Sequence, residues 1–243
     1  MPRLPFPLLR RAALSRLVAI GLLALTAGTL AAEESKTPDK AARELMLAAH
    51  NARAVWNDFP GFTADITIRT DGQQHAGTIS AGSDFEYDLK IAEEAKQPWV
   101  KAKLRSVISH RRPDPFSENG FAFVPESGSD VAGQLVAELD GSGTFRIQNG
   151  VIAEVLRKDD AQWMEISNLD MFVTAEGKQL PRATAVTFRE PASGNLKSQL
   201  SNTFEWKRFG QFDLPTRTFT VEVANNGKRT VREIVFRNHR LAQ

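Results

Sequence analysis

The segment FTADITIR, residues 62–69, alternates apolar and polar side chains without a break. A period of two is typical of a β-strand that turns one face toward a core and the other toward a polar environment. The segment TDGQ follows at residues 70–73, and an Asp-Gly pair favours a tight turn between strands. The segments GTISAG (77–82) and FEYDLKI (85–91) continue the pattern. These residues predict three consecutive strands joined by short turns.

The second half of the chain repeats this pattern. Its clearest example is the hairpin around NNGK (225–228), because Asn and Gly tolerate the positive φ angles of a tight turn. Strands with one apolar face are typical of antiparallel sheets. We therefore expect an α+β fold, in which two or three helices cover a single, strongly curved antiparallel sheet, a half-barrel of roughly ten strands. The further strand candidates are residues 121–124, 133–139, 143–149, 151–158, 162–168, 183–190, 199–209, 214–224 and 229–238.

Two segments have a helical period instead. The segment TPD (37–39) supplies an N-cap at Thr37, a proline at the first helical position and an acid in the first turn. Apolar residues then recur at helical spacing up to Trp56, which predicts a helix that ends near Asn57. A second helix is predicted over KQPWVKAKLRSVISH (96–110), with its apolar stripe at Val100, Leu104, Val107 and Ile108.

Residues 1–31 have the three parts of a secretory signal peptide: four arginines, an apolar run at 17–30, and small residues before a cleavage site after Ala31. An uncleaved anchor is less favoured, because a span needs about 20 apolar residues. We predict a signal peptide at 1–31, a single domain at 32–243, and export to the periplasm or the extracellular space. The mature chain keeps 27 basic against 29 acidic residues, a balance that gives no basis for a nucleic-acid partner.

The residue types give little support for catalysis. The chain has no cysteine, which excludes disulfides, and its four histidines are not spaced as metal ligands. It has no G-x-S-x-G motif, phosphate loop or dinucleotide fingerprint, and adjacency alone does not make Ser109 and His110 a dyad. We therefore expect no metal, no cofactor and no enzyme activity, and a hydrolase using His110 is the most distant alternative.

The segment HRRPDPF, residues 110–116, follows the last apolar residue of the second helix and has two interpretations. In the first, His110, Arg111 and Arg112 cap the helix, since cations complement its negative end and bond its free carbonyls, and Pro113 ends it. In the second, the arginines bind an anion or a lipid headgroup at the rim of a pocket. The sequence favours the first interpretation and leaves the second open.

The segments HRRPDPFSENGFAF (110–123) and ARAVWNDFPGFTADITIRTDGQQHAGTI (52–79) resemble an uncharacterised family of unknown function from bacteria and plant plastids. That resemblance implies no activity. More distantly, residues 61–89 and FDLPTRTFTVEV (212–223) resemble the periplasmic lipoprotein-carrier superfamily, which sorts lipoproteins to the outer membrane. This second resemblance implies a half-open barrel with helices over an apolar cavity, although the HRRPDPF segment departs from the carriers.

The leading hypothesis is a non-enzymatic periplasmic carrier or binding module for a hydrophobic ligand, either a lipid or an acyl chain. Its partners would be that ligand, an envelope protein and, transiently, the membrane surface. The alternative is an envelope structural or protein-interaction module with a solid core, because inward aromatic residues are also needed simply to fill a fold. The candidate ligand-binding residues are Trp56, Phe62, Ile66, Ile68, Phe85, Tyr87, Trp99 and Leu104, with His110, Arg111 and Arg112 at the rim.

Overall fold

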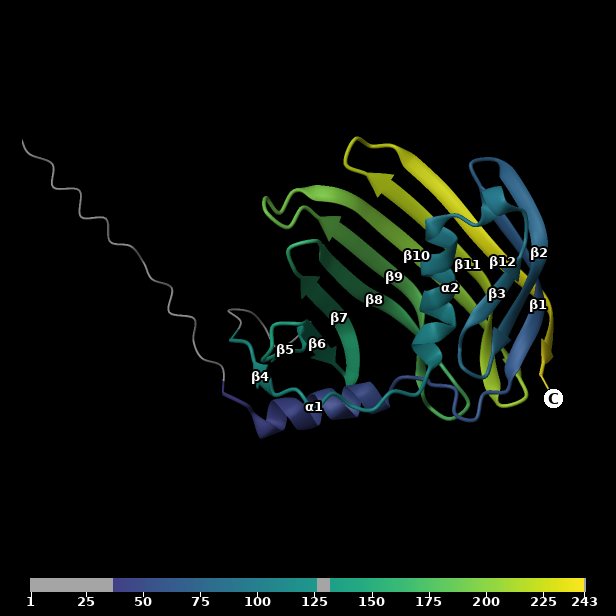
Figure 1. Ribbon diagram of the computed structural model, residues 1–243. Coiled ribbons are helices and arrows are strands. Elements are labelled where there is room, and N and C mark those ends of the chain that lie inside the picture. The colour runs from purple at the N-terminus through teal and green to yellow at the C-terminus, as the bar shows by residue number, and fades with distance from the viewer. Residues whose placement is uncertain (1–36, 126–131, 243) are drawn as a thin grey trace, which may run out of the picture. The chain divides into compact units, whose positions relative to one another are not determined.

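The computed structural model of the protein describes residues 37–125 and 132–242 (Figure 1). The predicted signal peptide at 1–31 lies outside these residues. Within them, no helix is long and apolar enough to cross a membrane.

Twelve strands form one sheet in the order β3-β2-β1-β12-β11-β10-β9-β8-β7-β6-β5-β4 (Figure 1). Every neighbouring pair is antiparallel. The strands are β1 (Gly61–Thr70), β2 (Gln73–Gly82), β3 (Tyr87–Lys90), β4 (Phe121–Phe123), β5 (Gln134–Glu138), β6 (Thr144–Gln148), β7 (Val151–Lys158), β8 (Trp163–Val173), β9 (Gln179–Arg189), β10 (Leu196–Phe209), β11 (Phe212–Ala224) and β12 (Arg229–Leu241).

The antiparallel sheet with few helices confirms the predicted fold class, but two details of the prediction are wrong. The sheet has twelve strands, because every segment with a period of two forms one, including the three-residue strand β4 and the four-residue strand β3. It is also not the strongly curled half-barrel that we expected. Its long middle consists of β8 to β12, which have 11 to 14 residues each.

The first helix, α1 (Lys40–Asn51), begins and ends differently from the prediction. Asp39 is the N-cap in place of Thr37, since its Oδ1 accepts hydrogen bonds from the backbone N–H groups of Ala41 at 2.7 Å and Ala42 at 3.2 Å. The helix ends before Asn57 because the next backbone groups pair with Gln179 at the start of β9. The Ala54 N–H donates to the Gln179 carbonyl and the Gln179 N–H donates to the Ala52 carbonyl, both at 2.9 Å.

The second helix, α2 (Pro98–Val107), is shorter than predicted and lies between two one-turn 3₁₀ helices, η1 (Glu93–Ala95) and η2 (Ser109–Arg111). Pro98 is at its first turn, where a missing N–H costs nothing. The predicted apolar stripe is confirmed, because Val100, Leu104, Val107 and the following Ile108 are all buried.

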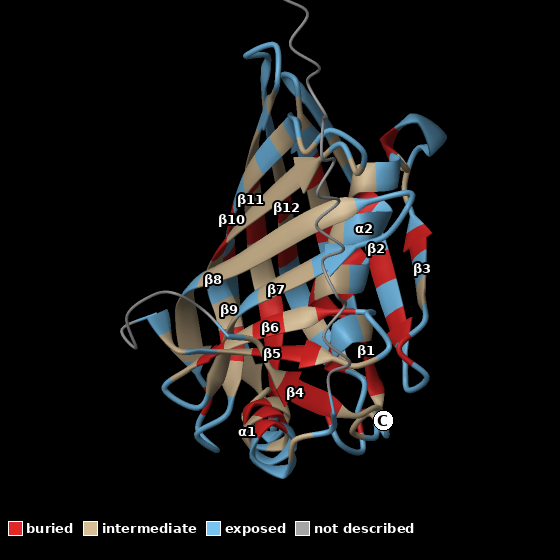
Figure 2. Ribbon diagram, turned by 90° about the vertical axis from the view of Figure 1, so that its left-hand side faces the viewer, coloured by how far each residue is buried: buried red, intermediate tan, exposed pale blue. Residues whose placement is uncertain are grey.

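Two buried clusters lie between the helices and the same face of the sheet, which we call the inner face. The larger cluster joins α2 to β1, β2 and β3 and to β10, β11 and β12. The smaller cluster joins α1 to β4, β5 and β6, with partly buried residues of β7 beside it. Figure 2 shows the residues of β8, by contrast, as mostly intermediate in burial.

Candidate functional site

A row of apolar side chains on the inner face of the sheet belongs to neither buried cluster. Its register is regular: Ile166 pairs with Val186, which pairs with Leu200, and Met164 pairs with Phe188. All five side chains are partly exposed. We call this surface the uncovered strip: Met164, Ile166, Val186, Phe188 and Leu200 of β8, β9 and β10.

The two helices leave this strip open because each packs on a different part of the sheet. Helix α1 contacts β4, β6 and β7, whereas the buried residues of α2 pack on β1 to β3 and β10 to β12. Figure 1 shows β8 and β9 between these two covered regions. An apolar surface left in water favours contact with another apolar group, so the strip can bind an apolar chain.

A row of polar side chains borders the strip on the same face of the sheet. It lies two residues further along β9 and β10 than Val186 and Leu200. Thr184, Asn202 and Thr220 are cross-strand neighbours on β9, β10 and β11, and all three are buried. The Asn202 amide donates to the Thr184 hydroxyl at 3.1 Å, and the Thr220 hydroxyl donates to Asn202 Oδ1 at 2.8 Å. These bonds fix the orientation of the Asn202 amide.

Lys103 of α2 reaches this polar row from the helix side. Its Nζ donates to Asn202 Oδ1 at 2.6 Å and lies 5.2 Å from the centre of the Phe204 ring. Burial, together with the neighbouring positive charge of Arg232, lowers the pKa of the Lys103 amine to about 8. Arg232 itself is paired with Glu222, at 2.6 Å. The border of the strip therefore carries a cation next to an apolar surface.

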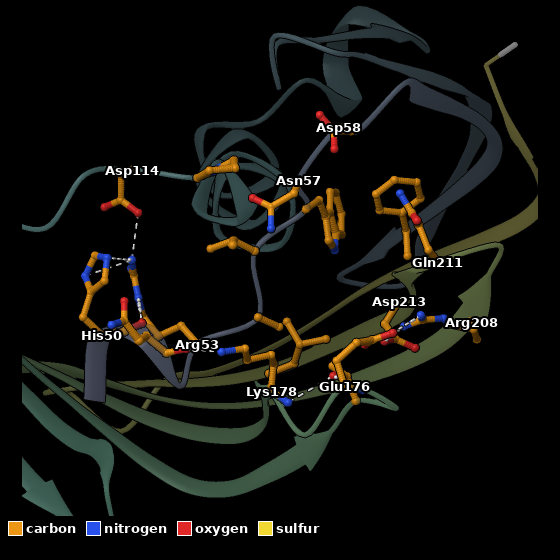
Figure 3. A pocket seen from close by; sticks show the side chains of 18 residues that line it. His50, Arg53, Asn57, Asp58, Asp114, Glu176, Lys178, Arg208, Gln211 and Asp213 are labelled. Carbon is orange, nitrogen blue, oxygen red and sulfur yellow. Dashed lines mark hydrogen bonds and ion pairs between the residues drawn. The ribbon is translucent and has the colours of Figure 1, made fainter. Parts of the chain in front are cut away.

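A separate polar cleft of about 690 Å³ lies at the end of α1 (Figure 3). Residues 50–58, the segment at Pro113 and Asp114, and the β8–β9 and β10–β11 turns meet there. Trp56 lines it, and the buried Trp56 Nε1 has no hydrogen-bond partner within the described part of the chain. The lining residues are His50, Asn51, Arg53, Ala54, Val55, Trp56, Asn57, Asp58, Pro113, Asp114, Thr174, Glu176, Lys178, Leu180, Arg208, Gln211, Phe212 and Asp213.

The charged groups of the cleft pair with one another in two places. At one end the Arg53 guanidinium bonds Asp114 at 2.7 Å and contacts the ring of His50, whose pKa is lowered by burial and by Arg53. At the other end Arg208 bonds Asp213 at 2.9 Å and also Glu176 (Figure 3).

Arg208 holds the pKa of the Glu176 carboxyl down at about 2, because it donates hydrogen bonds to the charged form. Between the two ends, Lys178 Nζ donates to the Asn51 carbonyl at 2.7 Å. Each of the three cations Arg53, Lys178 and Arg208 thus has a protein acceptor. The cleft suits a polar ligand better than an apolar chain.

The structure places the His110–Arg112 segment at the end of α2, where the predicted capping contacts are replaced by others. Arg111 is buried, with 8% of its surface exposed, and its Nη1 donates to the Ala54 carbonyl at 3.4 Å. Arg112 donates to the Asp84 carbonyl and its guanidinium lies over the Phe85 ring.

The arginine side chains therefore bond the α1–β1 segment and the β2–β3 turn, while the backbone N–H groups of Arg111 and Arg112 donate to the Ile108 and Ser109 carbonyls. His110 is an exposed residue, but neighbouring atoms partly desolvate its ring. This desolvation and the nearby charges of Arg111, Arg105 and Arg53 lower its pKa. Ser109 Oγ donates to the Phe85 carbonyl at 3.4 Å and, within the described residues, makes no hydrogen bond to His110.

The structure brings the predicted ligand-binding residues together, but as a packed cluster. Six of them are buried side chains of the larger cluster, and Tyr87 and Trp99 pack against it partly buried. Of the eight, only Trp56 also lines the polar cleft. The six buried side chains are Trp56, Phe62, Ile66, Ile68, Phe85 and Leu104.

Sequence reasoning missed the strip and Lys103. The strip residues lie inside predicted strands and alternate like any core residue, so the sequence does not show that no helix covers them. For Lys103 a signal was present: it lies three residues after Val100 and four before Val107, within the apolar stripe of α2. In the part of the chain that the structure describes, no three His, Asp or Glu side chains gather as a metal site.

Comparison with known proteins gives one family match and a few distant structural likenesses. The profile of the family described as "Protein of unknown function (DUF3386)" matches residues 37–242. No curated protein sequence matches the chain.

The first two structural likenesses are to lipoprotein-sorting proteins. One is a LolA superfamily protein from Nitrosomonas europaea, with 11% identity, a TM-score of 0.36, and coverage of 83% of this chain and 94% of that one. The other is a putative outer membrane lipoprotein-sorting protein domain from Vibrio parahaemolyticus, with 9% identity, a TM-score of 0.35, and coverage of 82% and 91%.

A third likeness is to the MucA/MucB complex of Pseudomonas aeruginosa. It has 11% identity and a TM-score of 0.21, and it covers 84% of this chain and 99% of the other. All three TM-scores lie below 0.5, so no function is inferred from them.

Proposed function

The chain belongs to the DUF3386 family of proteins of unknown function, and from this premise we propose that it is a non-enzymatic binding module that carries a lipid or an acyl chain on the uncovered strip. The observation that carries the proposal is the strip itself: five apolar side chains on the inner face, partly exposed between two helix-covered regions.

A ligand lying on the strip displaces water from its apolar side chains. Fully burying one side chain of this size contributes about 1.5–3 kcal/mol. The strip side chains are already partly buried, so a covering ligand gains a share of that amount from each of five residues. Their side chains carry no nucleophile, acid or base, which supports binding without catalysis.

The proposed setting is the cell envelope. The arginines and apolar run at residues 1–31 support export to the periplasm or the extracellular space. A lipid or acylated ligand there would come from the membrane, so transient contact with the membrane surface and an envelope protein as donor or acceptor belong to the same proposal.

The test is native mass spectrometry of the protein purified from the envelope of cells that express the full chain, followed by solvent extraction. A stoichiometric lipid or acyl species supports the proposal. An apo mass, together with no uptake of added fatty acid or phospholipid, would refute it.

Two matched variants show whether the strip is the binding surface. Leu200→Asp places a carboxylate within the strip, whereas Val223→Asp places one on the opposite face, because Val223 pairs with Gln199 next to Leu200. We expect the bound species to be lost from the first variant and kept in the second. Retention in both would exclude the strip.

The alternative function, an envelope structural or protein-interaction module, is favoured by a different observation. Six of the residues predicted to line an apolar cavity lie in a buried cluster under α2, which supports a solid core there. If the protein carries no ligand, the partner surface to examine is the segment from His110 to Phe116.

A further inference from the structure

Among the residues that the structure describes, no carboxylate is paired with the cation Lys103. Its Nζ donates to the uncharged Asn202 Oδ1, at 2.6 Å. Within the described residues no carboxylate bonds or pairs with its Nζ. Glu222, the acid on the same face of β11, is already bonded to Arg232 at 2.6 Å.

This arrangement has an energetic cost that the protein itself does not offset. Removing a charge from water is unfavourable unless an opposite charge or a full set of hydrogen bonds replaces the water. The Lys103 amine has three N–H donors, and one of them is used by a group in residues 37–125 and 132–242. Asn202 Oδ1 already accepts from Thr220 as well, at 2.8 Å, so the amide offers Lys103 little more.

The position of Lys103 relates its charge to the strip. Asn202, its partner, is two residues from Leu200 on β10, and alternation along a strand puts both side chains on the inner face. Two residues along a strand span about 7 Å. The strip then runs across the sheet from Leu200 to Val186 and on to Ile166. Each of these two steps lengthens the path from Asn202 by one strand spacing, about 4.8 Å.

We propose that Lys103 binds the oxyanion headgroup, a carboxylate or a phosphate, of a single-chain anionic amphiphile whose apolar chain lies on the uncovered strip. This inference rests on the proposed function and names its ligand class. Charge complementarity indicates the ligand, because a cation with no acid partner among the described residues borders an apolar surface. The cations of the polar cleft are unsuitable for this role. Arg53 and Arg208 are already paired with carboxylates, and Lys178 lines the cleft, which contains none of the strip residues.

The experiment is isothermal titration calorimetry of the full chain at pH 7 with four probes: sodium laurate, dodecyl phosphate, 1-dodecanol and inorganic phosphate. Each is titrated into the unmodified protein and into Lys103→Met, which keeps an unbranched side chain, one atom shorter, and removes its charge. Lys101→Met is the matched control, since Lys101 is exposed on the same helix. Circular dichroism confirms that each variant is folded.

We expect laurate and dodecyl phosphate to bind Lys103→Met about tenfold more weakly or worse, which is the loss of one hydrogen bond to a charged group. Dodecanol should bind the unmodified protein and both variants equally. Lys101→Met should bind every probe as the unmodified protein does.

The other outcomes separate the two proposals. Equal binding of laurate to the unmodified protein and Lys103→Met would overturn the headgroup role and leave the strip as a neutral binding surface. Failure of every dodecyl compound to bind the unmodified protein would overturn the proposed function as well. If inorganic phosphate bound as tightly as dodecyl phosphate, the site would bind a free oxyanion. That result would overturn the proposal that the ligand is an amphiphile.

Discussion

Replacing Lys103 with methionine should make the protein more stable at neutral pH. The pKa of the amine falls from 10.5 to about 8 on folding, and each unit corresponds to about 1.4 kcal/mol of lost interaction for the charged form. The charge therefore destabilises the fold by about 3 kcal/mol. Methionine also loses the hydrogen bond that the charged amine donates to Asn202, worth about 1.5 kcal/mol or more, so the expected net gain at pH 7 is at most about 2 kcal/mol.

The pH dependence identifies the cause of this gain. Between pH 8 and 10.5 the unfolded chain binds more protons at Lys103 than the folded chain does, so the stability of the unmodified protein rises with pH across that window. Lys103→Met lacks this rise, and its advantage should disappear by about pH 10.5. Other groups that titrate there, such as Tyr87, contribute equally to both proteins and cancel in the difference.

Urea unfolding followed by circular dichroism at pH 7, 8, 9, 10 and 10.5 measures the difference in unfolding free energy. Lys101→Met, on the exposed side of α2, should follow the unmodified protein throughout. If the curves for Lys103→Met and the unmodified protein run parallel, or if the variant is less stable at pH 7, Lys103 does not carry a desolvated charge and the reasoning is wrong.

Three further predictions concern other parts of the molecule. Asp39→Ala removes the N-cap of α1 and should lower the unfolding free energy by about 1 kcal/mol; an unchanged urea midpoint would contradict the cap. Leu104→Ala empties the centre of the larger cluster, where Leu104 has no exposed surface, and should cost about 2–5 kcal/mol in the same assay; a smaller loss would mean that the cluster is loosely packed. Arg208→Gln should raise the pKa of the Glu176 carboxyl from about 2 toward its usual value, which an NMR titration detects, and a pKa that stays near 2 would show that Arg208 is not the cause.

Alternation along the chain located the strands, because a half-buried strand needs one apolar residue in every two. Alternation did not give the correct strand ends where pairing with a neighbouring strand extends a strand beyond its alternating residues. β9 begins at Gln179, four residues before the predicted candidate, although Pro181 lies within it. Proline is tolerated there because the sheet is irregular beside it, with a register shift between Asp170 and Met171, the partner of Pro181.

The candidate site could be predicted only in part. The sequence shows which residues are apolar and which strand face they share. It does not show which part of that face a helix covers, because this depends on the tertiary packing of α1 and α2. Trp56 and Leu104 belong to the covered part, and Ile166 and Leu200 to the uncovered part, although all four are apolar residues in regular patterns. The lysine in the stripe of α2 is the exception, since a charged residue at a core spacing can be recognised from the sequence alone.

The order of the strands has a consequence for the way the chain folds. All neighbouring strands are consecutive in the sequence except β1 and β12, where the Arg69 guanidinium bonds the Glu233 carboxylate at 2.5 Å across 164 residues of chain. Local hairpins form before distant segments meet, so the β1–β12 seam should close last. During synthesis, β1 therefore pairs with β2 while its other edge stays without a partner strand. β1 gains its second neighbour only after β12, residues 229–241, has been synthesised.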